Sequence, residues 1–497
     1  MTTSLSREGR VTRAPLSPRA LNLTFGAIAV VASLALVTSL GKSIWTDEAV
    51  SLYSAHLSWP ALWQQSQAVD RVFLPYYALL HLWLLINGSI EWARVLSLLA
   101  YALSVFVVGR LGDRLAGFWC GVAAAVLCAT NPLMVQEALD ARPYALTALF
   151  VTLSIAFLLR WLDGGSTQHF WWYAVAAIAA LAMQLLAVLA PLAALAVVIL
   201  RRPAITRVRW RSVVLPTGVL LVVSIGFAAI TLGQRAQVGW IHSLTGTYLL
   251  NALNGPAASS SFSGRVAYTL VVIALLVAAV VILLISRSRL RACVSRTDVD
   301  RFDMLVAWAA LPTVALIVVS LVKPIYLSRY VTASAPGLAL AVALLVTKAY
   351  EVRPEALRDA ALAVRASLFA LTVALVLGAA AASTYQAEQL AQASRGLEEQ
   401  VGTTGVAAFT NPLIAQDFAI YAPTRHWPLL QRENLMFWKL DLRTSASTFA
   451  SAPANVWVVL GIDSGRFIKL MKSHGYSRVG EETFSGDISV SIEHLRR

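Results

Sequence analysis

Two adjacent carboxylates, Asp47 and Glu48, follow an uncharged and largely apolar run from Leu21 to Leu40. A run of about 20 such residues is long enough to cross a lipid bilayer, so both acids are expected at a membrane surface. Ionisable side chains beside lipid are costly in free energy and are usually functional or paired. A carboxylate there is suited to act as a general base toward a hydroxyl group. The pair therefore indicates a functional site at the end of the first span.

The two acids are expected to differ in role, because adjacent residues of a helix point about 100° apart. Asp47 lies nearer to the end of the span and is predicted to be the base. Glu48 is predicted to support it, either by holding a nearby cation or by capping the following helix, where an acid in the first turn is favoured. The simpler alternative is that both acids are merely solvated.

Four further polar groups stand at the ends of apolar segments. They are Asp70 with Arg71, Gln136 to Tyr144 (QEALDARPY), Gly233 to His242, and Lys323 to Tyr330 (KPIYLSRY). Acids and cations gathered at one face of a bilayer indicate a site for a polar, anionic group at the lipid boundary.

Simpler explanations exist for the members of these groups. Glu137, Asp140 and Arg142 could form a structural ion pair across a helical turn. Arg329 could extend to lipid headgroups. Tyr76 and Tyr77 could belong to the aromatic belt of the membrane interface.

The composition is that of a membrane protein, with 58% hydrophobic and only 13% charged residues. Soluble proteins contain about 25% charged residues. Eleven apolar segments are long enough to be candidate spans: 22–40, 92–109, 116–134, 144–160, 170–186, 187–200, 213–232, 266–285, 304–321, 331–347 and 362–383. The segment from Leu74 to Asn87 is too short to span and predicts an interfacial or re-entrant helix.

Basic residues predict the orientation of these spans. Arginines concentrate in alternate loops, around Arg114, Arg160, Arg207, Arg291 and Arg358. Because cytoplasmic loops are enriched in Lys and Arg, the N-terminus is predicted inside the cell. The net charge of +14 then needs no nucleic-acid partner.

The domain organisation follows from the spans. We expect a cytoplasmic basic tail (1–21), a transmembrane catalytic domain (22–383) with an external loop (41–91), and an extracytoplasmic domain (384–497). In the last domain GVAAFTNP, VWVVLGID and ISVSIEHL resemble strands, and SGRFIKLMKSHGY resembles a helix with a glycine stop. The predicted fold is an all-α polytopic membrane protein with a small C-terminal α/β domain.

Four motifs occur in an order that resembles one group of membrane enzymes. WTDEAVSLY, VDRVFLPYYALLHLWL, QEALDARPYAL and KPIYLSRYVTASAPGLAL lie between residues 45 and 340. Together they resemble the C-type (GT-C) glycosyltransferases, and among these the bacterial family 39, which includes protein O-mannosyltransferases and aminoarabinose transferases. The resemblance covers roughly residues 22 to 345. It implies a GT-C architecture and transfer of a hexose or pentose from a polyprenyl-phosphate carrier, with inversion, at the outer face of the cytoplasmic membrane.

The resemblance also implies roles for residues. It gives Asp47 the catalytic role, with Glu48 beside it. Cations must take up the negative charge that develops on the leaving phosphate, and the candidates are Arg142, Arg329, Lys323 and Arg71. Substrate-binding candidates are Asp70, Tyr76, Tyr77, Glu137 and Asp140.

Two departures from the family pattern affect these assignments. Many relatives have His-Pro-Pro before the tyrosines, where this chain has DRVFLPYY. The usual short QEAR-x-YAL is longer here, so Glu137 and Asp140 compete for one inferred role.

The expected partners are a polyprenyl-phosphate sugar, membrane lipids and a glycan, glycolipid or protein acceptor of the cell envelope. No cofactor is expected to be required, although a divalent metal that bridges acids and phosphate is compatible with the pattern. The main alternative is a polytopic transporter or a flippase for lipid-linked sugars. Against it, the charges gather at one face and not at the bilayer midplane, where transporters place their sites.

Overall fold

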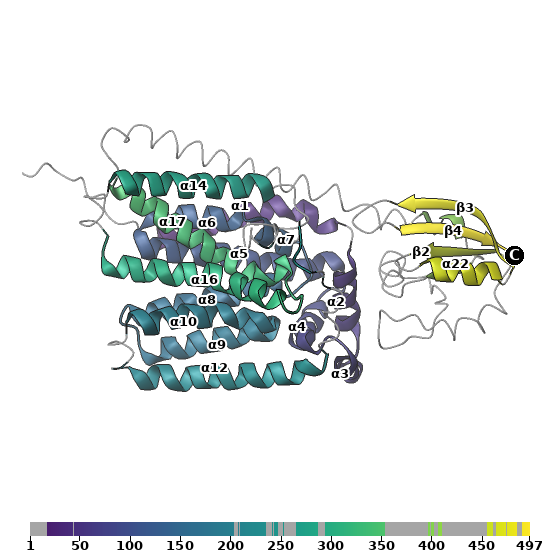
Figure 1. The fold of residues 1–497 in the computed structure, drawn as a ribbon, viewed down its shortest axis with the longest axis horizontal. Helices are drawn as coiled ribbons and strands as arrows, with labels where there is room; N and C mark the ends of the chain where they lie inside the picture. Colours follow the sequence, from purple (N-terminus) through teal and green to yellow (C-terminus); the bar gives the residue numbers. More distant parts are fainter. Residues whose placement is uncertain are drawn as a thin grey trace, which may run out of the picture.

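The helical part of the chain is a bundle of long apolar helices that lie side by side (Figure 1). The computed structural model describes residues 17–42, 44–202, 207, 209–234, 241, 243–246, 252, 265–286, 294–352, 396–397, 399–401, 406–409, 455–460, 464–473, 475–484 and 490–497. The bundle helices are α1 (Pro18–Val37), α5 (Ile90–Ala116), α6 (Phe118–Ala129), α8 (Tyr144–Leu162), α9 (Thr167–Met183), α10 (Leu189–Arg201), α12 (Trp210–Thr231), α14 (Arg265–Ile285), α16 (Arg296–Ser320) and α17 (Ala335–Val352).

Among the described residues, seven helices are long and apolar enough to cross a membrane, or eight if one bent pair counts as a single span. Ten of the eleven predicted segments coincide with helices, but α9 and α10 are shorter than a full span. The eleventh, 362–383, lies outside the described residues. The prediction of an all-α polytopic membrane protein is confirmed. The count of eleven membrane spans stays a prediction.

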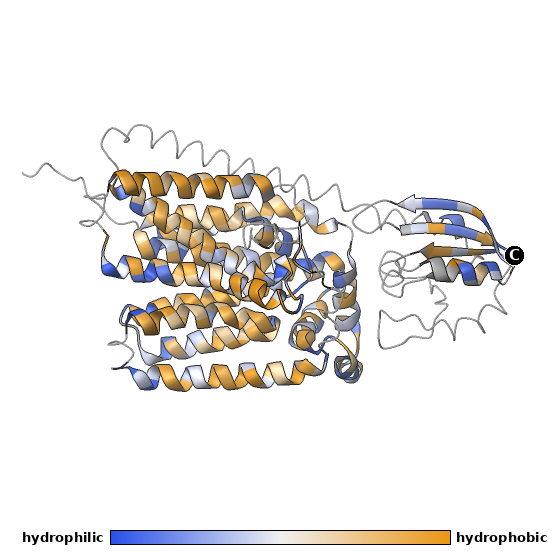
Figure 2. Cartoon of the chain, viewed as in Figure 1, coloured by the Kyte–Doolittle hydropathy of each residue, from blue (hydrophilic) through white to orange (hydrophobic). Residues whose placement is uncertain are grey.

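The surface of the bundle is apolar, as contact with lipid requires. Figure 2 shows hydrophobic residues along the bundle helices and hydrophilic ones near their ends. In α12, Val222 and Ile225 are 71% and 68% exposed. Such large aliphatic side chains, repeated over α12 and α14, would form an unusually large apolar patch in water. The chain is therefore a multi-pass membrane protein.

A bend interrupts the segment that was predicted to span at 116–134. Helix α6 ends at Ala129, and α7 (Pro132–Ala138) continues at an angle of 60°. Pro132 lacks the backbone N–H that would continue the hydrogen bonds of α6, and the Asn131 side chain accepts hydrogen bonds from the amides of Leu133 and Met134 at the start of α7. This cap redirects the chain at one end of the bundle.

Short helices form a layer at that end. They are η1 (Thr38–Gly41), α2 (Thr46–His56), α3 (Trp59–Ala68), η2 (Arg71–Phe73), α4 (Leu74–Leu84) and, before α17, η6 (Ser328–Ser334). Figure 1 shows α2, α3 and α4 together beyond the ends of the long helices. Their core includes Leu52, Tyr76 and Leu80, packed with Leu146 of α8. The prediction of a short helix near 74–87 is confirmed.

The C-terminal part contains a four-stranded sheet with the order β1-β2-β4-β3. The strands are β1 (Val406–Phe409), β2 (Asn455–Leu460), β3 (Ser477–Phe484) and β4 (Val490–Arg496), and α22 spans Ser464–Ser473. Strands β1 and β2 are parallel, and the other pairs are antiparallel. The three predicted strands and the helix are confirmed. Strand β3 was not predicted, because its sequence SRVGEETF has few apolar residues.

Candidate functional site

The acid pair lies in the first turn of α2, which begins after Trp45. Acids are favoured in a first turn because they face the positive end of the helix dipole. The layer of short helices brings α2 against α4 and against the segment that connects α7 to α8. Residues of α2, of α4 and of the segment between α7 and α8 therefore meet here.

Glu48 is fully buried and forms a two-pronged ion pair with Arg94 of α5. The Arg94 Nε and Nη2 atoms donate to its two carboxylate oxygens at 2.8 and 2.7 Å. The backbone amide of Ala141 donates a third hydrogen bond at 2.7 Å. Burial alone raises the pKa of Glu48, but Arg94, Lys42 and the hydrogen bond from Ala141 together outweigh it, and the pKa lies below its usual value. Glu48 thus holds a cation, one of the two supporting roles expected for it.

Arg94 also fixes the chain that leads into α2. Its Nη1 atom donates to the carbonyl oxygens of Leu40 and Lys42, both at 2.6 Å. These contacts join the end of the first span to α5 and, through Glu48, to α2.

Asp47 points toward two arginines that come from distant segments. Its Oδ2 atom lies 3.6 Å from Nη2 of Arg142 and 3.0 Å from Nη2 of Arg329. Arg142 is almost completely buried, and its Nη1 atom also donates to the Asp47 carbonyl and to the Ser51 hydroxyl, each at 3.0 Å. The Arg329 guanidinium lies over the ring of Trp45, 5.3 Å from its centroid. The two arginines of different motifs thus share one carboxylate.

A second carboxylate, Asp70, lies beside this group. Its Oδ2 atom accepts a hydrogen bond of 3.0 Å from the Tyr77 hydroxyl. The Phe73 ring also contacts the site, because the Arg142 guanidinium lies 4.7 Å from its centroid. Burial raises the pKa of the Asp70 carboxyl, while the charge of Arg142 and the hydrogen bond from Tyr77 oppose the increase only in part.

Glu137 and Asp140, the two candidates for one family position, have different surroundings. Asp140 forms an ion pair with Lys42. Both carboxylate oxygens of Glu137 are buried and have no hydrogen-bond partner among the described residues, and the same holds for the hydroxyls of Tyr76 and Tyr144. Buried polar atoms without partners are uncommon in folded proteins and often mark functional sites.

Arg71 and Lys323, which were also predicted to bind phosphate, do not contact Asp47 as Arg142 and Arg329 do. The Arg71 Nε atom donates to the Ser66 carbonyl at 3.1 Å, and an Nη2 atom donates to the Gln67 side chain. Lys323 is exposed in the segment after α16. Within the described residues, neither forms an ion pair with an acid of the site. Their role in phosphate binding stays a prediction.

The sequence did not reveal Arg94, Lys42 or Trp45 as members of the site. Arg94 lies near the start of a long apolar segment, and an ionisable residue in that position is the signal that could have identified it.

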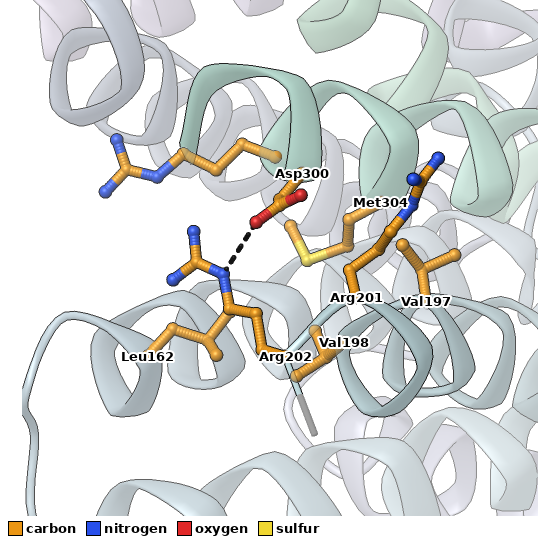
Figure 3. Close-up of a pocket in the computed structure, with 8 residues that line it drawn as sticks. Leu162, Val197, Val198, Arg201, Arg202, Asp300 and Met304 are labelled. Atoms are coloured by element: carbon orange, nitrogen blue, oxygen red, sulfur yellow. Dashed lines mark hydrogen bonds and ion pairs between the residues drawn. The ribbon is translucent and has the colours of Figure 1, made fainter. Parts of the chain in front are cut away.

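A different cluster of charges lies where α10 and α16 meet, away from α2. Figure 3 shows a small pocket there, lined by Leu162, Val197, Val198, Arg201, Arg202, Asp300, Arg301 and Met304. Arg202 pairs with Asp300 at 3.1 Å, and Arg301 pairs with Asp163 at 2.7 Å. Since each arginine has an acidic partner, the cluster ties helices together and is not a candidate anion site.

The chemistry available around α2 is that of anion binding beside carboxylates. In the described parts of the chain, no group of three or more His, Cys, Asp or Glu side chains could hold a metal ion. Guanidinium groups match the geometry of phosphate, and the nearby carboxylates can accept a proton.

Comparisons with known proteins identify the fold. No protein-family model and no curated protein sequence matches the chain. Its structure is similar to ArnT from Cupriavidus metallidurans bound to undecaprenyl phosphate, with a TM-score of 0.57 and 13% identity over 96% of this chain and 98% of that one. The apo state of ArnT gives a TM-score of 0.58 at the same identity and coverage. For an Archaeoglobus fulgidus oligosaccharyltransferase the TM-score is 0.48, with 12% identity over 91% of this chain and 71% of that chain. The chain therefore has the GT-C fold of membrane glycosyltransferases.

Proposed function

We propose that this protein is a glycosyltransferase that moves a sugar from a polyprenyl-phosphate carrier to a hydroxyl group of a cell-envelope acceptor. The observation that carries the proposal is the convergence of Arg142 and Arg329 on Asp47, at the end of a bundle of apolar helices. A polyprenyl-phosphate sugar needs an apolar surface for its lipid chain. Its phosphate needs a cationic site where that apolar surface ends. The ArnT structure, which carries undecaprenyl phosphate, supports this choice of donor.

The reaction requires little from the protein beyond charge and position. The sugar leaves from a phosphate, which needs no protonation but must have its growing negative charge stabilised. Two guanidinium groups supply that stabilisation, and Arg142 has a buried Nε–H without an acceptor among the described residues. Direct attack by the acceptor hydroxyl inverts the anomeric configuration. The hydroxyl needs a carboxylate base, a role predicted for Asp47, with Glu137 or Asp140 as the next candidates.

The proposed location is the outer face of the cytoplasmic membrane, with the N-terminus in the cytoplasm and the C-terminal sheet outside. The basic cluster of Arg201, Arg202 and Arg301 lies where α10 and α16 meet, away from α2. Such clusters favour the cytoplasmic side, which would place α2 outside.

The test uses the full chain in nanodiscs with a panel of polyprenyl-phosphate hexoses and pentoses, and octyl glycosides as hydroxyl acceptors. We expect at least one donor to release polyprenyl phosphate in step with formation of a new glycoside of inverted configuration. If no donor is cleaved, and proteoliposomes instead move a labelled donor between leaflets, the protein is a flippase and the proposal is wrong.

A further inference from the structure

The Arg142 guanidinium is anchored along one edge by groups that do not include a carboxylate. Its Nη1 atom donates to the Asp47 carbonyl and to the Ser51 hydroxyl, each at 3.0 Å. The Ser51 hydroxyl in turn donates to the same carbonyl at 2.9 Å, and the centroid of the Phe73 ring lies 4.7 Å from the guanidinium. Because these contacts involve only the backbone of Asp47, they can hold Arg142 in place whatever the Asp47 carboxylate binds.

The opposite edge of the same guanidinium carries the Nε and Nη2 atoms. In Arg94 this edge donates to both carboxylate oxygens of Glu48. In Arg142 the Nε atom is buried without an acceptor among the described residues. Its Nη2 atom lies 3.6 Å from Asp47 Oδ2, which is too long for a good hydrogen bond. The edge therefore offers two parallel N–H groups, the arrangement that binds a phosphate through two of its oxygens.

The Asp47 carboxylate faces the N–H groups that a bound phosphate would need. One of its oxygen atoms, Oδ2, lies near Nη2 of Arg142 and 3.0 Å from Nη2 of Arg329. A phosphate that contacts both arginines must approach the position of this oxygen, and two anions at one contact repel each other. The Asp47 side chain is 29% exposed, so packing leaves it free to turn away from the arginines.

We infer that the donor phosphate replaces the Asp47 carboxylate at the Nε–Nη2 edge of Arg142 and at Nη2 of Arg329, and that this exchange releases Asp47 to act as the base. The inference rests on the proposed function and adds an order to it, because the donor must bind before the acceptor can lose its proton. In the transfer step the acceptor oxygen bonds to the anomeric carbon, and its proton passes to the Asp47 carboxylate. The bond between the anomeric carbon and the phosphate oxygen breaks, and its electron pair leaves with polyprenyl phosphate. When the carrier departs, Asp47 gives the proton to water and returns to the arginines.

Replacement of Asp47 by asparagine tests the exchange through two effects of opposite sign. Asparagine is neutral and of similar size, and the contacts of Arg142 with the backbone carbonyl and with Ser51 remain. Without the competing carboxylate, Asp47→Asn should bind undecaprenyl phosphate about fivefold more tightly than the wild type. The same variant should lose about 10²–10⁴-fold in kcat, because it lacks the base. Both quantities are measured on the full chain in nanodiscs.

Asp47→Glu and Asp163→Asn are the controls. Glutamate keeps a carboxylate that competes with the phosphate, so Asp47→Glu should bind undecaprenyl phosphate about as the wild type does. Asp163 also pairs with two arginines, Arg114 and Arg301, each at 2.7 Å, but in the cluster away from α2. Asp163→Asn should therefore leave the affinity unchanged.

Two further variants separate competition from a general effect of charge. Arg329→Gln removes one of the two cations that Asp47 and the phosphate share, so the gain in affinity from Asp47→Asn should shrink in that background. Ser51→Ala removes an anchor of the Arg142 Nη1 atom and should weaken binding of undecaprenyl phosphate by a few-fold, the opposite sign to Asp47→Asn. Folding of each variant is checked by its thermal unfolding in detergent.

An affinity of Asp47→Asn for undecaprenyl phosphate that is equal to or lower than that of the wild type would overturn the inference. A gain of the same size in the Arg329→Gln background, or in Asp163→Asn, would also overturn it, because the effect would then be one of net charge. Wild-type affinity in Ser51→Ala would contradict the anchor on which the exchange depends, and this result does not require Asp47→Asn to fold. Failure of the proposed function is a separate result, because the wild-type protein itself would then cleave no polyprenyl-phosphate sugar.

Discussion

Asp47 and Glu48 are adjacent in one helical turn but have different surroundings. Glu48 faces the bundle interior and Arg94, where it is fully buried. Asp47 faces Arg142 and Arg329, and 29% of its side chain is exposed. The angle of about 100° between consecutive helical residues produces this division. One acid pairs with a buried arginine inside the bundle, and the other belongs to the proposed phosphate-binding site.

The Glu48 ion pair gives a stability prediction. Glu48→Gln leaves Arg94 buried without a counter-charge, which costs about 3–5 kcal/mol. We expect a large fall in the thermal unfolding temperature of the purified protein. The control is Glu351→Gln, which removes a partner of Lys348 that is 42% exposed and should cost at most about 1 kcal/mol. Equal effects of the two substitutions would contradict a stabilising role for the buried pair.

The sequence allowed the prediction of which residues gather at the site but not of how they pair. Asp47, Glu48, Arg142 and Arg329 could be found because each stands at the end of an apolar segment. The pairing of Glu48 with Arg94 could not be predicted, since the two residues lie 46 positions apart on different helices. Such a pair depends on how helices pack, and that information is absent from local spacing.

At the scale of elements, helix ends and close contacts position the site. The cap at Asn131 bends the chain between α6 and α7. Length and hydropathy predicted one continuous span here, because neither measure detects a bend. The short helix α4 was predictable, since an apolar run of that length cannot cross a bilayer.

The contact between α5 and α6 gives a prediction at this scale. A Cβ atom added at Gly112 would lie 2.8 Å from the Cys120 carbonyl oxygen and 2.8 Å from the Gly121 Cα. Gly112→Ala should therefore push the helices apart and cost about 1–3 kcal/mol. Gly26→Ala in α1 is the matched control, because a Cβ there meets nothing within 4 Å. Alanine favours a helix over glycine, so the control should keep or raise the unfolding temperature; a fall in the control equal to that of Gly112→Ala would contradict this account.

At the scale of the whole molecule, the charged ends of the bundle predict its orientation in the membrane. Single cysteines at Gln64 in α3 and at Lys472 in α22 should react with a membrane-impermeant maleimide added to intact cells. A cysteine at Gln168, at the start of α9, should react only after the membrane is opened. All three positions are exposed, and the native cysteines are first replaced by alanine. Labelling of Gln168→Cys from outside would reverse the orientation.

The central claim is that Arg142 and Arg329 bind the phosphate of a polyprenyl carrier. Its most direct test is the affinity of the purified protein for undecaprenyl phosphate. This molecule is the carrier without its sugar, so the test does not depend on which sugar is transferred. Lysine cannot replace the two-pronged contact of arginine with phosphate, and a lost hydrogen bond to a charged group costs about 1.5–3 kcal/mol. Arg142→Lys and Arg329→Lys should each weaken binding about tenfold or more, whereas Arg301→Lys, in the cluster where α10 and α16 meet, should bind as the wild type does. Wild-type affinity in both site variants, or an equal loss in Arg301→Lys, would contradict the claim.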